Sequence, residues 1–227
     1  MTAKDMFSHR VSILTGHYGT GKTEVSVNLA LALAAEGEQV MLADLDIVNP
    51  YFRSRERRPL LEKAGVRVIS SSQACSDADV PALPAELLTI LENREIRGIL
   101  DIGGDPVGAR VLARFQAKIV QEDYQLIFVL NANRPEVRDA ESAAAYLRSI
   151  EAVTGLTCSG LVNNTHLCGE TTPAEIRKGA ALAQEVSRQT GIPILCHTAE
   201  RRFLESLSDL GEPVFPIAIN MKKPWER

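Results

Sequence analysis

Apolar segments of two kinds alternate along the chain. Short runs that are apolar at nearly every position predict buried strands at 11–14, 39–45, 67–70, 98–102, 126–131, 160–163 and 192–196. Longer segments with one apolar face predict helices at 24–36, 84–93, 107–122, 136–154, 174–190 and 201–207. Strands that alternate with helices indicate an α/β fold, in which helices flank both faces of a doubly wound, mainly parallel sheet in three layers.

The length of the chain fits one such unit. Its 227 residues can bury a full core, and the sequence has no linker, low-complexity tract or internal repeat. We therefore expect a single domain over residues 1–227. Gly37 is the expected stop of the first helix, the polar stretch 70–79 is the most loop-like segment, and 214–219 forms an apolar tail.

A glycine-rich loop follows the first predicted strand. Glycines let backbone N–H groups turn inward around phosphate oxygens, and the N-terminus of the next helix adds its dipole. In such a loop Lys22 is expected to reach the β- and γ-phosphates, and the Thr23 hydroxyl to bind Mg²⁺. The pattern G-x-x-x-x-G-K-T therefore predicts a P-loop nucleotide site, formed by Gly16, His17, Tyr18, Gly19, Thr20, Gly21, Lys22 and Thr23.

Carboxylates stand at the ends of two further predicted strands. Asp44 and Asp46 lie at the end of one, and Asp101 lies at the end of another. Because parallel strands open their carboxyl ends onto one edge, we expect these groups to converge with Lys22. The alternative is that the acids only cap turns.

Two glycines, Gly103 and Gly104, follow Asp101 directly. They permit the backbone to approach a γ-phosphate closely, and they permit the segment to move when that phosphate leaves. A plain tight turn is the alternative interpretation.

Together these motifs resemble the MinD/ParA branch of P-loop ATPases, a class that also includes the nitrogenase iron protein and several metal-insertion GTPases. The resemblance implies Mg²⁺ and ATP binding, slow hydrolysis and a homodimer that encloses nucleotide. It further implies that Asp46 orients the attacking water, while Asp44 and Asp101 hold the water shell of Mg²⁺. It rests on residues 16–23, on Asp44-x-Asp46, on Asp101-x-Gly103-Gly104 and on the late strand that ends in Asn163.

The loop departs from that family at one position. The usual loop reads G-K-G-G-x-G-K-[ST], and its first lysine reaches across the dimer, whereas His17 stands there in this chain and Tyr18 follows it. An imidazole is a weaker phosphate partner than an ammonium group. Either the dimer is not made in this way, or another cation substitutes. An arginine finger and a solvated basic loop are both open interpretations for Arg53, Arg55, Arg57 and Arg58.

The late strand ends in a segment that bears on the choice of base. Guanine readers usually carry N-K-x-D, but residues 163–166 read Asn-Asn-Thr-His and lack the lysine and the aspartate. This favours adenine, with Asn163 or Asn164 as the candidate contact. The loop 196–199 is a second candidate, and the role of the segment 131–135 at the same edge is open.

Composition, charge and hydropathy bear on the expected partners, the location and the state of the cysteines. A net charge of -4 and a pI near 5.7 give no nucleic-acid signature. No apolar run spans a bilayer, and the N-terminus lacks the apolar core of a signal peptide, so we expect a cytoplasmic protein without a membrane anchor. The cysteines contain no C-x-x-C pair and are interpreted as reduced thiols rather than a metal site, at positions 75, 158, 168 and 196.

Three functions fit this sequence. The favoured one is a Mg-ATP switch whose nucleotide state controls dimerisation or binding of an unknown protein partner. The second is an ATP-dependent ligase or kinase of the dethiobiotin-synthetase kind, whose second substrate would meet the arginines of 53–58. The third is a metallocentre-insertion GTPase, for which His166 and Cys168 are the only hint. An iron–sulfur redox role is disfavoured because no cysteine follows Asp101 closely, and membrane cycling is disfavoured because no terminal amphipathic helix is visible.

Overall fold

A single parallel sheet organises the chain. The computed structural model describes residues 1–46, 54–70 and 85–221. Within these, eight strands follow the order β3-β2-β4-β1-β5-β6-β7-β8, and each neighbouring pair is parallel. The strands are β1 Val11–Thr15, β2 Gln39–Leu45, β3 Arg67–Ser70, β4 Ile96–Ile102, β5 Tyr124–Leu130, β6 Cys158–Asn163, β7 Ile194–Glu200 and β8 Val214–Ile217.

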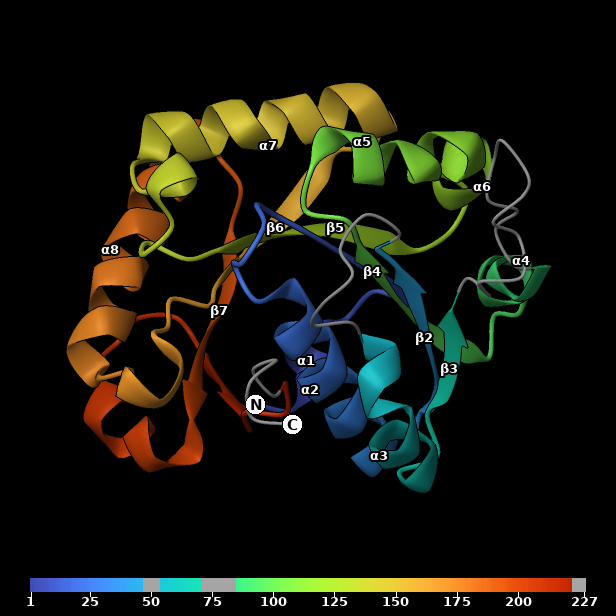
Figure 1. The fold of residues 1–227 in the computed structure, drawn as a ribbon, viewed down its shortest axis with the longest axis horizontal. Coiled ribbons are helices and arrows are strands. Elements are labelled where there is room, and N and C mark those ends of the chain that lie inside the picture. Colours follow the sequence, from blue (N-terminus) through green and yellow to red (C-terminus); the bar gives the residue numbers. More distant parts are fainter. Residues whose placement is uncertain (47–53, 71–84, 222–227) are drawn as a thin grey trace.

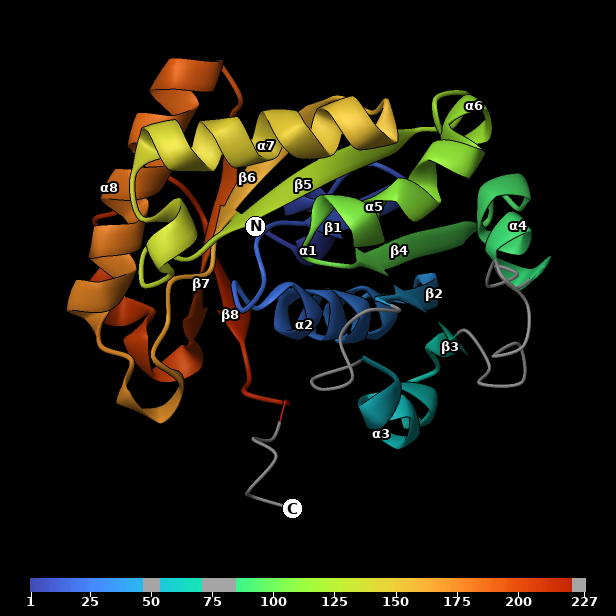
Figure 2. The ribbon, with the colours of Figure 1, turned by 45° about the horizontal axis from the view of Figure 1, so that its top comes forward.

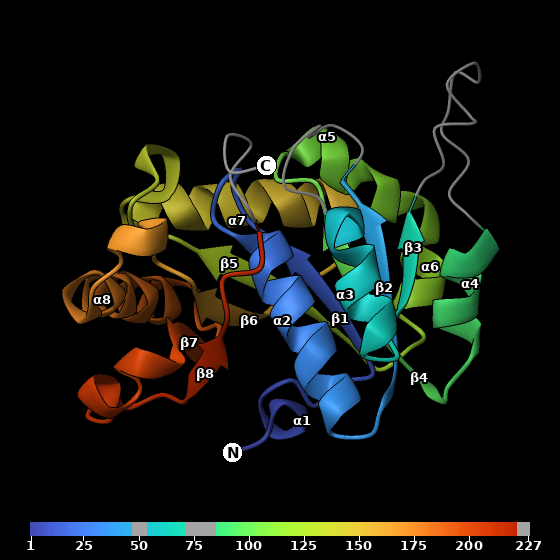
Figure 3. The same cartoon turned by 60° about the horizontal axis from the view of Figure 1, so that its bottom comes forward.

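Helices cover both faces of this sheet (Figures 1 and 3). One face carries α1 Ala3–Met6, α2 Lys22–Ala35 and α3 Arg58–Lys63, the last preceded by the 3-10 turn η1 Ser54–Arg57. The other face carries α4 Ala85–Glu92, α5 Pro106–Ala109, η3 Arg110–Phe115, α6 Gln116–Ile119, α7 Ala140–Thr154 and α8 Pro173–Thr190. Short 3-10 turns complete the chain at η4 Pro135–Val137, η5 Cys168–Glu170, η6 Arg201–Phe203 and η7 Glu205–Leu207.

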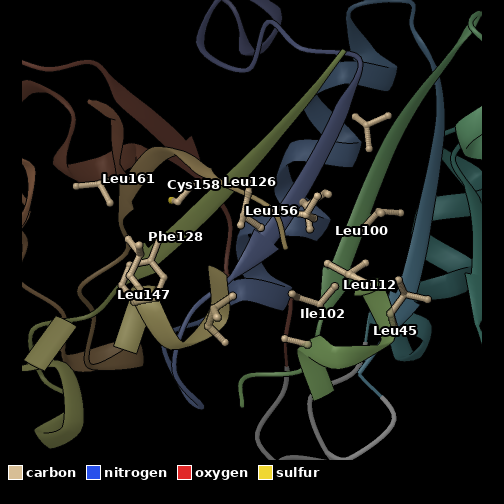
Figure 4. Close-up of a cluster of buried hydrophobic side chains, with 14 of the residues drawn as sticks. Leu45, Leu100, Ile102, Leu112, Leu126, Phe128, Leu147, Leu156, Cys158 and Leu161 are labelled. Carbon is tan, nitrogen blue, oxygen red and sulfur yellow. The ribbon is translucent and has the colours of Figure 1, made fainter. Parts of the chain in front are cut away.

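The two faces of the sheet support separate hydrophobic clusters. Side chains of β1, β4 and β5 alternate between them: Ile13 and Phe128 pack under α7, whereas Leu14 and Val129 pack under α2. Figure 4 shows the first cluster, where Phe128 faces Leu147. Each such fully buried side chain stabilises the fold by about 1.5–3 kcal/mol. The strands are therefore fixed from both sides, and their carboxyl ends form a rigid edge.

The predicted fold class is confirmed, and several elements have the expected bounds. β2 and β3 begin and end where the apolar pattern places them, and Gly37, just beyond α2, has a φ of 86° that suits glycine. The expected helix 107–122 is instead the three short pieces α5, η3 and α6, and the boundary between η3 and α6 falls at Phe115, which leaves helical geometry at φ -111° and ψ 0°. The expected helix 136–154 begins as η4, and α7 starts only after Asp139, whose carboxylate accepts the Ser142 N–H.

Two short helices were not predicted. α1 is closed by a capping box in which Thr2 and Asp5 satisfy each other's backbone N–H groups. α3 has Pro59 in its first turn, where the missing N–H costs nothing. The expected last helix 201–207 is resolved into η6 and η7.

A strap of four residues beyond β8 lies against the start of α2. Buried Asn28 accepts the Ala218 N–H at 2.8 Å and donates to its carbonyl at 2.9 Å. Glu24 accepts the N–H groups of Asn220 and Met221 at 2.8 and 3.0 Å. Burial raises the pKa of Glu24, and these hydrogen bonds oppose that rise. Residues 218–221 thus tie the far end of the described chain to the helix that follows the glycine loop.

Some sequence predictions fall outside the described residues. They concern most of the stretch 70–79, Arg53 and Cys75. Among the helices that the structure does describe, none combines the length and apolar character needed to cross a membrane.

Candidate functional site

The glycine loop joins β1 to α2 at the carboxyl edge of the sheet. Its backbone turns back on the His17 carbonyl, which accepts the Thr20 N–H at 3.2 Å and the Thr20 hydroxyl at 2.9 Å. Gly16 has a φ of 140°, and a Cβ there would lie 2.4 Å from the Val129 carbonyl oxygen. Gly21 precedes α2 at φ 84°, in the left-handed region. The loop conformation therefore requires the glycines that the sequence supplies.

Lys22 is the buried cation of this edge. The side chain is only 6% exposed, and its ammonium group donates to the His17 carbonyl at 3.3 Å. Burial lowers the pKa of Lys22, while the nearby carboxylates of Asp101, Asp46 and Asp105 raise it. The structure thus brings Lys22 together with acids from two strand ends, as the sequence predicted for Asp46 and Asp101.

Asp44 and Asp101 face each other across neighbouring strands. The register of β2 and β4 pairs Asp44 with Asp101 directly, and both residues are buried. Burial, together with the negative charge of Asp44, raises the pKa of Asp101 to about 7, whereas Lys22 and the Thr23 hydroxyl favour its ionised form. No residue in the described ranges gives either Asp101 oxygen a hydrogen bond of good geometry, although Thr23 lies close enough to act on its charge.

These residues fit the requirements of Mg²⁺. The buried carboxylate of Asp101, beside the Thr23 hydroxyl, offers hard oxygen ligands of the kind Mg²⁺ prefers. Within residues 1–46, 54–70 and 85–221, no three acidic, histidine or cysteine side chains form a closed metal cage. Mg²⁺ usually takes one or two carboxylates and completes its shell with water and substrate phosphates.

The turn after β4 lies against the glycine loop. A Cβ on Gly104 would sit 2.7 Å from the Lys22 ammonium nitrogen and 2.9 Å from the Tyr18 backbone nitrogen. A Cβ on Gly103 would lie 3.5 Å from an Asp46 carboxylate oxygen. The two glycines therefore bring the main chain of this turn into the space between Lys22, Asp46 and the loop. A turn whose residues carried side chains could not approach them so closely.

Asp105 completes this turn and was not assigned a role from the sequence. Its carboxylate accepts the Gly108 N–H at 2.7 Å and so caps α5. It also acts on the charge of Lys22 and, with burial as the larger cause, raises the pKa of Tyr146 to about 12. Only its position after Gly104 could have signalled its place in the site.

His17 points back onto its own chain. Its ring packs edge-on against Tyr146 of α7, with centroids 5.0 Å apart, and its Nδ1 lies 3.8 Å from a Glu136 carboxylate oxygen. Tyr18, in contrast, is 52% exposed. The side chain at the position of the family's cross-dimer lysine thus makes intramolecular contacts in this protein.

The two asparagines after β6 have different surroundings. Asn163 is fully buried, and its amide bonds the Ile176 carbonyl, the His197 ring and the Thr165 N–H. Asn164 instead donates to the Thr20 carbonyl at 2.8 Å, and its own oxygen accepts the Thr198 hydroxyl. The structure therefore brings Asn164 to the glycine loop and places Asn163 in a polar network behind it.

Arg134 covers the outer side of the loop. It comes from the segment 131–135, whose role the sequence left open, and its Nε donates to the Gly19 carbonyl at 2.7 Å. Its charge adds to burial in lowering the pKa of His166 to about 4, so His166 is neutral at pH 7. His166 Nδ1 accepts the Cys168 N–H at 3.3 Å.

The basic segment after Asp46 is only partly described. Arg58 lies 3.3 Å from Glu62, one helical turn away. The Nε of Arg57 is buried without a hydrogen-bond partner among the described residues.

Of the described cysteines, Cys158 and Cys196 are buried, and burial raises the pKa of both thiols, that of Cys158 to about 12. Buried thiols of this kind are unreactive, which agrees with the expectation of reduced cysteines.

Comparison with known proteins agrees with this geometry. The family described as ParA, the NUBPL iron-transfer P-loop NTPase, matches residues 6–54. The septum site-determining protein MinD of Helicobacter pylori is 24% identical over 96% of this chain and 87% of its own length. The cytosolic Fe-S cluster assembly factor cfd1 of Emericella nidulans is 36% identical over 42% of this chain, which spans 26% of that protein. The iron-sulfur cluster carrier protein of Escherichia coli is 50% identical over 18% of this chain and 11% of its own length.

Solved structures share the fold. The Signal Recognition Particle 54 kDa protein of Aeropyrum pernix, solved with GDP, superposes with a TM-score of 0.53 at 25% identity, over 82% of this chain and 40% of that one. The cell division protein ftsY of Thermotoga maritima gives a TM-score of 0.55 at 24% identity, over 81% and 59%. The fold and the loop together define a P-loop NTPase. More closely, the chain is similar to ParA-like P-loop NTPases, and the resemblance to the MinD/ParA class is confirmed.

Proposed function

We propose that the protein is a Mg-ATP-binding ATPase that acts as a nucleotide-dependent switch, built as a single domain over residues 1–227. One observation carries the proposal: the Lys22 ammonium group lies among the carboxylates of Asp101, Asp46 and Asp105 and beside the main chain of Gly104. A lysine, acidic groups at strand ends and a glycine pair at one edge are the parts that would sense whether a γ-phosphate is present.

Each residue has a defined task in this proposal. Lys22 and the inward N–H groups of residues 16–23 bind the phosphates, with Gly104 contributing from the opposite side. Thr23, Asp44 and Asp101 hold Mg²⁺, which would neutralise charge on the β- and γ-phosphates. Asp46 orients or deprotonates the attacking water, because it lies next to Lys22 without being as deeply buried as Asp101.

We further propose that ATP is preferred to GTP. The segment after β6 offers neutral His166 where guanine readers carry an acidic acceptor. Because Asn163 is engaged in the core, Asn164 is the better candidate for a group that affects nucleotide binding, and it does so through the Thr20 carbonyl. A contact between adenine and Asn163 or Asn164 remains part of this proposal.

The proposed output is a change in assembly. A homodimer that forms with ATP, or a protein partner that reads the nucleotide state, would meet the face where Tyr18 and Val107 are exposed. With His17 turned inward, the dimer would need another cation in place of the family's lysine. We also propose a cytoplasmic location, which the name of the cytosolic relative supports.

Iron–sulfur cluster handling is a second candidate, favoured by the similarity to the cfd1 assembly factor and to the iron-sulfur cluster carrier protein. Those similarities cover less than half of this chain, and the cysteines described here are dispersed. Reconstitution with iron and sulfide under reducing conditions tests it: a stable absorbing cluster supports this candidate, and its absence favours the switch alone.

The deciding experiment combines turnover with size. ATP and GTP hydrolysis are measured with Mg²⁺, and the molar mass is measured with ADP and with a non-hydrolysable ATP analogue. Lys22→Ala should abolish nucleotide binding, whereas the exposed control Lys63→Ala should match the parent protein. ATP-selective turnover with a mass change on the analogue supports the proposal. Binding without turnover or mass change would instead favour a ligase or kinase that needs a second substrate.

A further inference from the structure

One side chain outside the candidate site contacts both the glycine loop and the turn after β4. Tyr146 lies in the middle of α7, on the face of the sheet opposite α2, and is half-buried. Figure 2 shows α7 crossing above β5 and reaching toward α5. No motif marks this tyrosine in the sequence, and its place follows only from the packing of α7.

The hydroxyl and the ring of Tyr146 contact different segments. The hydroxyl donates a hydrogen bond to the Gly104 carbonyl, in the turn after β4. The ring packs edge-on against His17 of the glycine loop at 5.0 Å and lies 6.4 Å from Phe128, which is buried in the core. Tyr146 is therefore bound to a rigid support and touches both segments that close on Lys22.

We propose that Tyr146 is a positioning residue for nucleotide turnover, which fixes the Gly104 peptide relative to the glycine loop. A carbonyl and the N–H of the same peptide unit point in opposite directions, so holding the Gly104 carbonyl also sets the direction of the Asp105 N–H. The same hydrogen bond limits how far Gly104 can move from Lys22. The inference rests on the proposed nucleotide function and adds the residue that couples the two segments.

The hydroxyl remains a donor throughout the neutral range. Burial and the Asp105 carboxylate hold the pKa of Tyr146 at about 12, so the group stays protonated wherever nucleotide turnover is measured. The effect of removing it should therefore not depend on pH between about 6 and about 9.

Three variants separate the contributions. Tyr146→Phe removes the hydroxyl and keeps the ring on His17, whereas Tyr146→Leu removes both. Tyr124→Phe is the matched control, because Tyr124 lies at the opposite, amino end of β5. We expect Tyr146→Phe to lower kcat about fivefold with KM changed less than about twofold, since one net hydrogen bond is involved. Tyr146→Leu should lose more, and Tyr124→Phe should match the parent.

Backbone hydrogen exchange supplies a readout that does not need turnover. In Tyr146→Phe, amides of 104–109 should exchange faster than in the parent protein, both free and with an ATP analogue bound. If exchange and kcat in Tyr146→Phe equal those of the parent, the inference is wrong. Equal losses of kcat and stability in Tyr124→Phe would also overturn it. If the parent binds nucleotide but does not hydrolyse it, the proposed ATPase fails, while the exchange comparison still decides the role of Tyr146.

Discussion

Asp44 and Asp101 lie directly opposite each other on neighbouring parallel strands, β2 and β4, and both are buried. Two carboxylates in such a position repel each other, and this repulsion adds to burial in raising the pKa of Asp101. The pair stores an unfavourable interaction that a divalent cation, or the loss of one charge, relieves. Because of this arrangement, the stability of the free protein should depend on pH even when no ligand is bound.

The first prediction concerns Asp101→Asn. The native pKa of about 7 exceeds the ordinary value of 3.8, so the native state binds more protons than the unfolded state between these values. Stability of the free protein should therefore fall as pH rises through this window and stay low above it. Asp101→Asn should remove that fall and be more stable than the parent at about pH 8, on the order of 1 kcal/mol or more.

Thermal unfolding at about pH 5 and about pH 8, without Mg²⁺ or nucleotide, checks this expectation. The same variant should lose Mg²⁺-dependent turnover, which separates the stabilising and functional effects of one substitution. A pH dependence that persists unchanged in Asp101→Asn would show that other groups cause it.

The second prediction concerns Asp46→Ala. Its carboxylate adds charge near Lys22, but the phosphates are bound by the loop, so nucleotide affinity should change little. Hydrolysis should fall about 100-fold or more, because positioned acid–base groups contribute that much to rate. Titration with a fluorescent nucleotide and single-turnover hydrolysis measure the two effects separately. Normal hydrolysis in this variant would refute the assignment of Asp46.

The third prediction concerns Gly104→Ala. The added methyl group would lie 2.9 Å from the Tyr18 nitrogen and 3.0 Å from its Cα, which are backbone atoms that cannot simply rotate away. The turn and the loop must therefore move apart. Turnover should fall about tenfold or more, because small misplacements of active-site groups lower the rate strongly. Gly211→Ala is the matched control, since a Cβ there meets nothing within 4 Å. Equal activity of the two variants would mean that the approach of Gly104 has no functional role.

The fourth prediction concerns the strap 218–221. Asn28→Ala removes both hydrogen bonds to Ala218 and leaves a backbone N–H without its partner, which should cost about 1–3 kcal/mol of unfolding free energy. Urea unfolding measures the cost, and hydrogen exchange should show faster exchange at 218–221. Asn28→Asp keeps an acceptor for the Ala218 N–H but places a buried carboxylate against that of Glu24, to which Asn28 donates at 3.1 Å, so it should not restore stability. An unchanged exchange rate in Asn28→Ala would mean that Glu24 alone holds the strap.

The sequence predicted most of the fold because strands buried on both faces are apolar without interruption. Residues 40–43 of β2 and 126–130 of β5 are such runs, and the glycine loop and strand-end acids follow from residue spacing alone. The split of 107–122 into three pieces was not predictable, because the apolar positions of Leu112 and Ile119 suit one helix as well as several turns. The capping box of α1, Thr2-x-x-Asp5, was a readable signal that was missed.

The residues that surround the loop were harder to foresee. Arg134, in the segment after β5, and Tyr146 of α7 lie more than a hundred residues further along the chain, and no spacing rule relates them to Gly19 or His17. Such contacts depend on how helices pack across the sheet. The identity of Lys22, Thr23 and the acids follows from local chemistry, whereas their support depends on tertiary structure.

The strap has a consequence for biosynthesis. Glu24 and Asn220 bond across 196 positions of sequence, so the helix that carries Lys22 leaves the ribosome long before the segment that closes over its first turns. A nascent chain can form the glycine loop early, yet it cannot complete the surroundings of α2 until β8 and residues 218–221 have been made. If translation stopped before residue 218, the chain would contain every phosphate-binding residue, but α2 would lack its hydrogen bonds to residues 218–221.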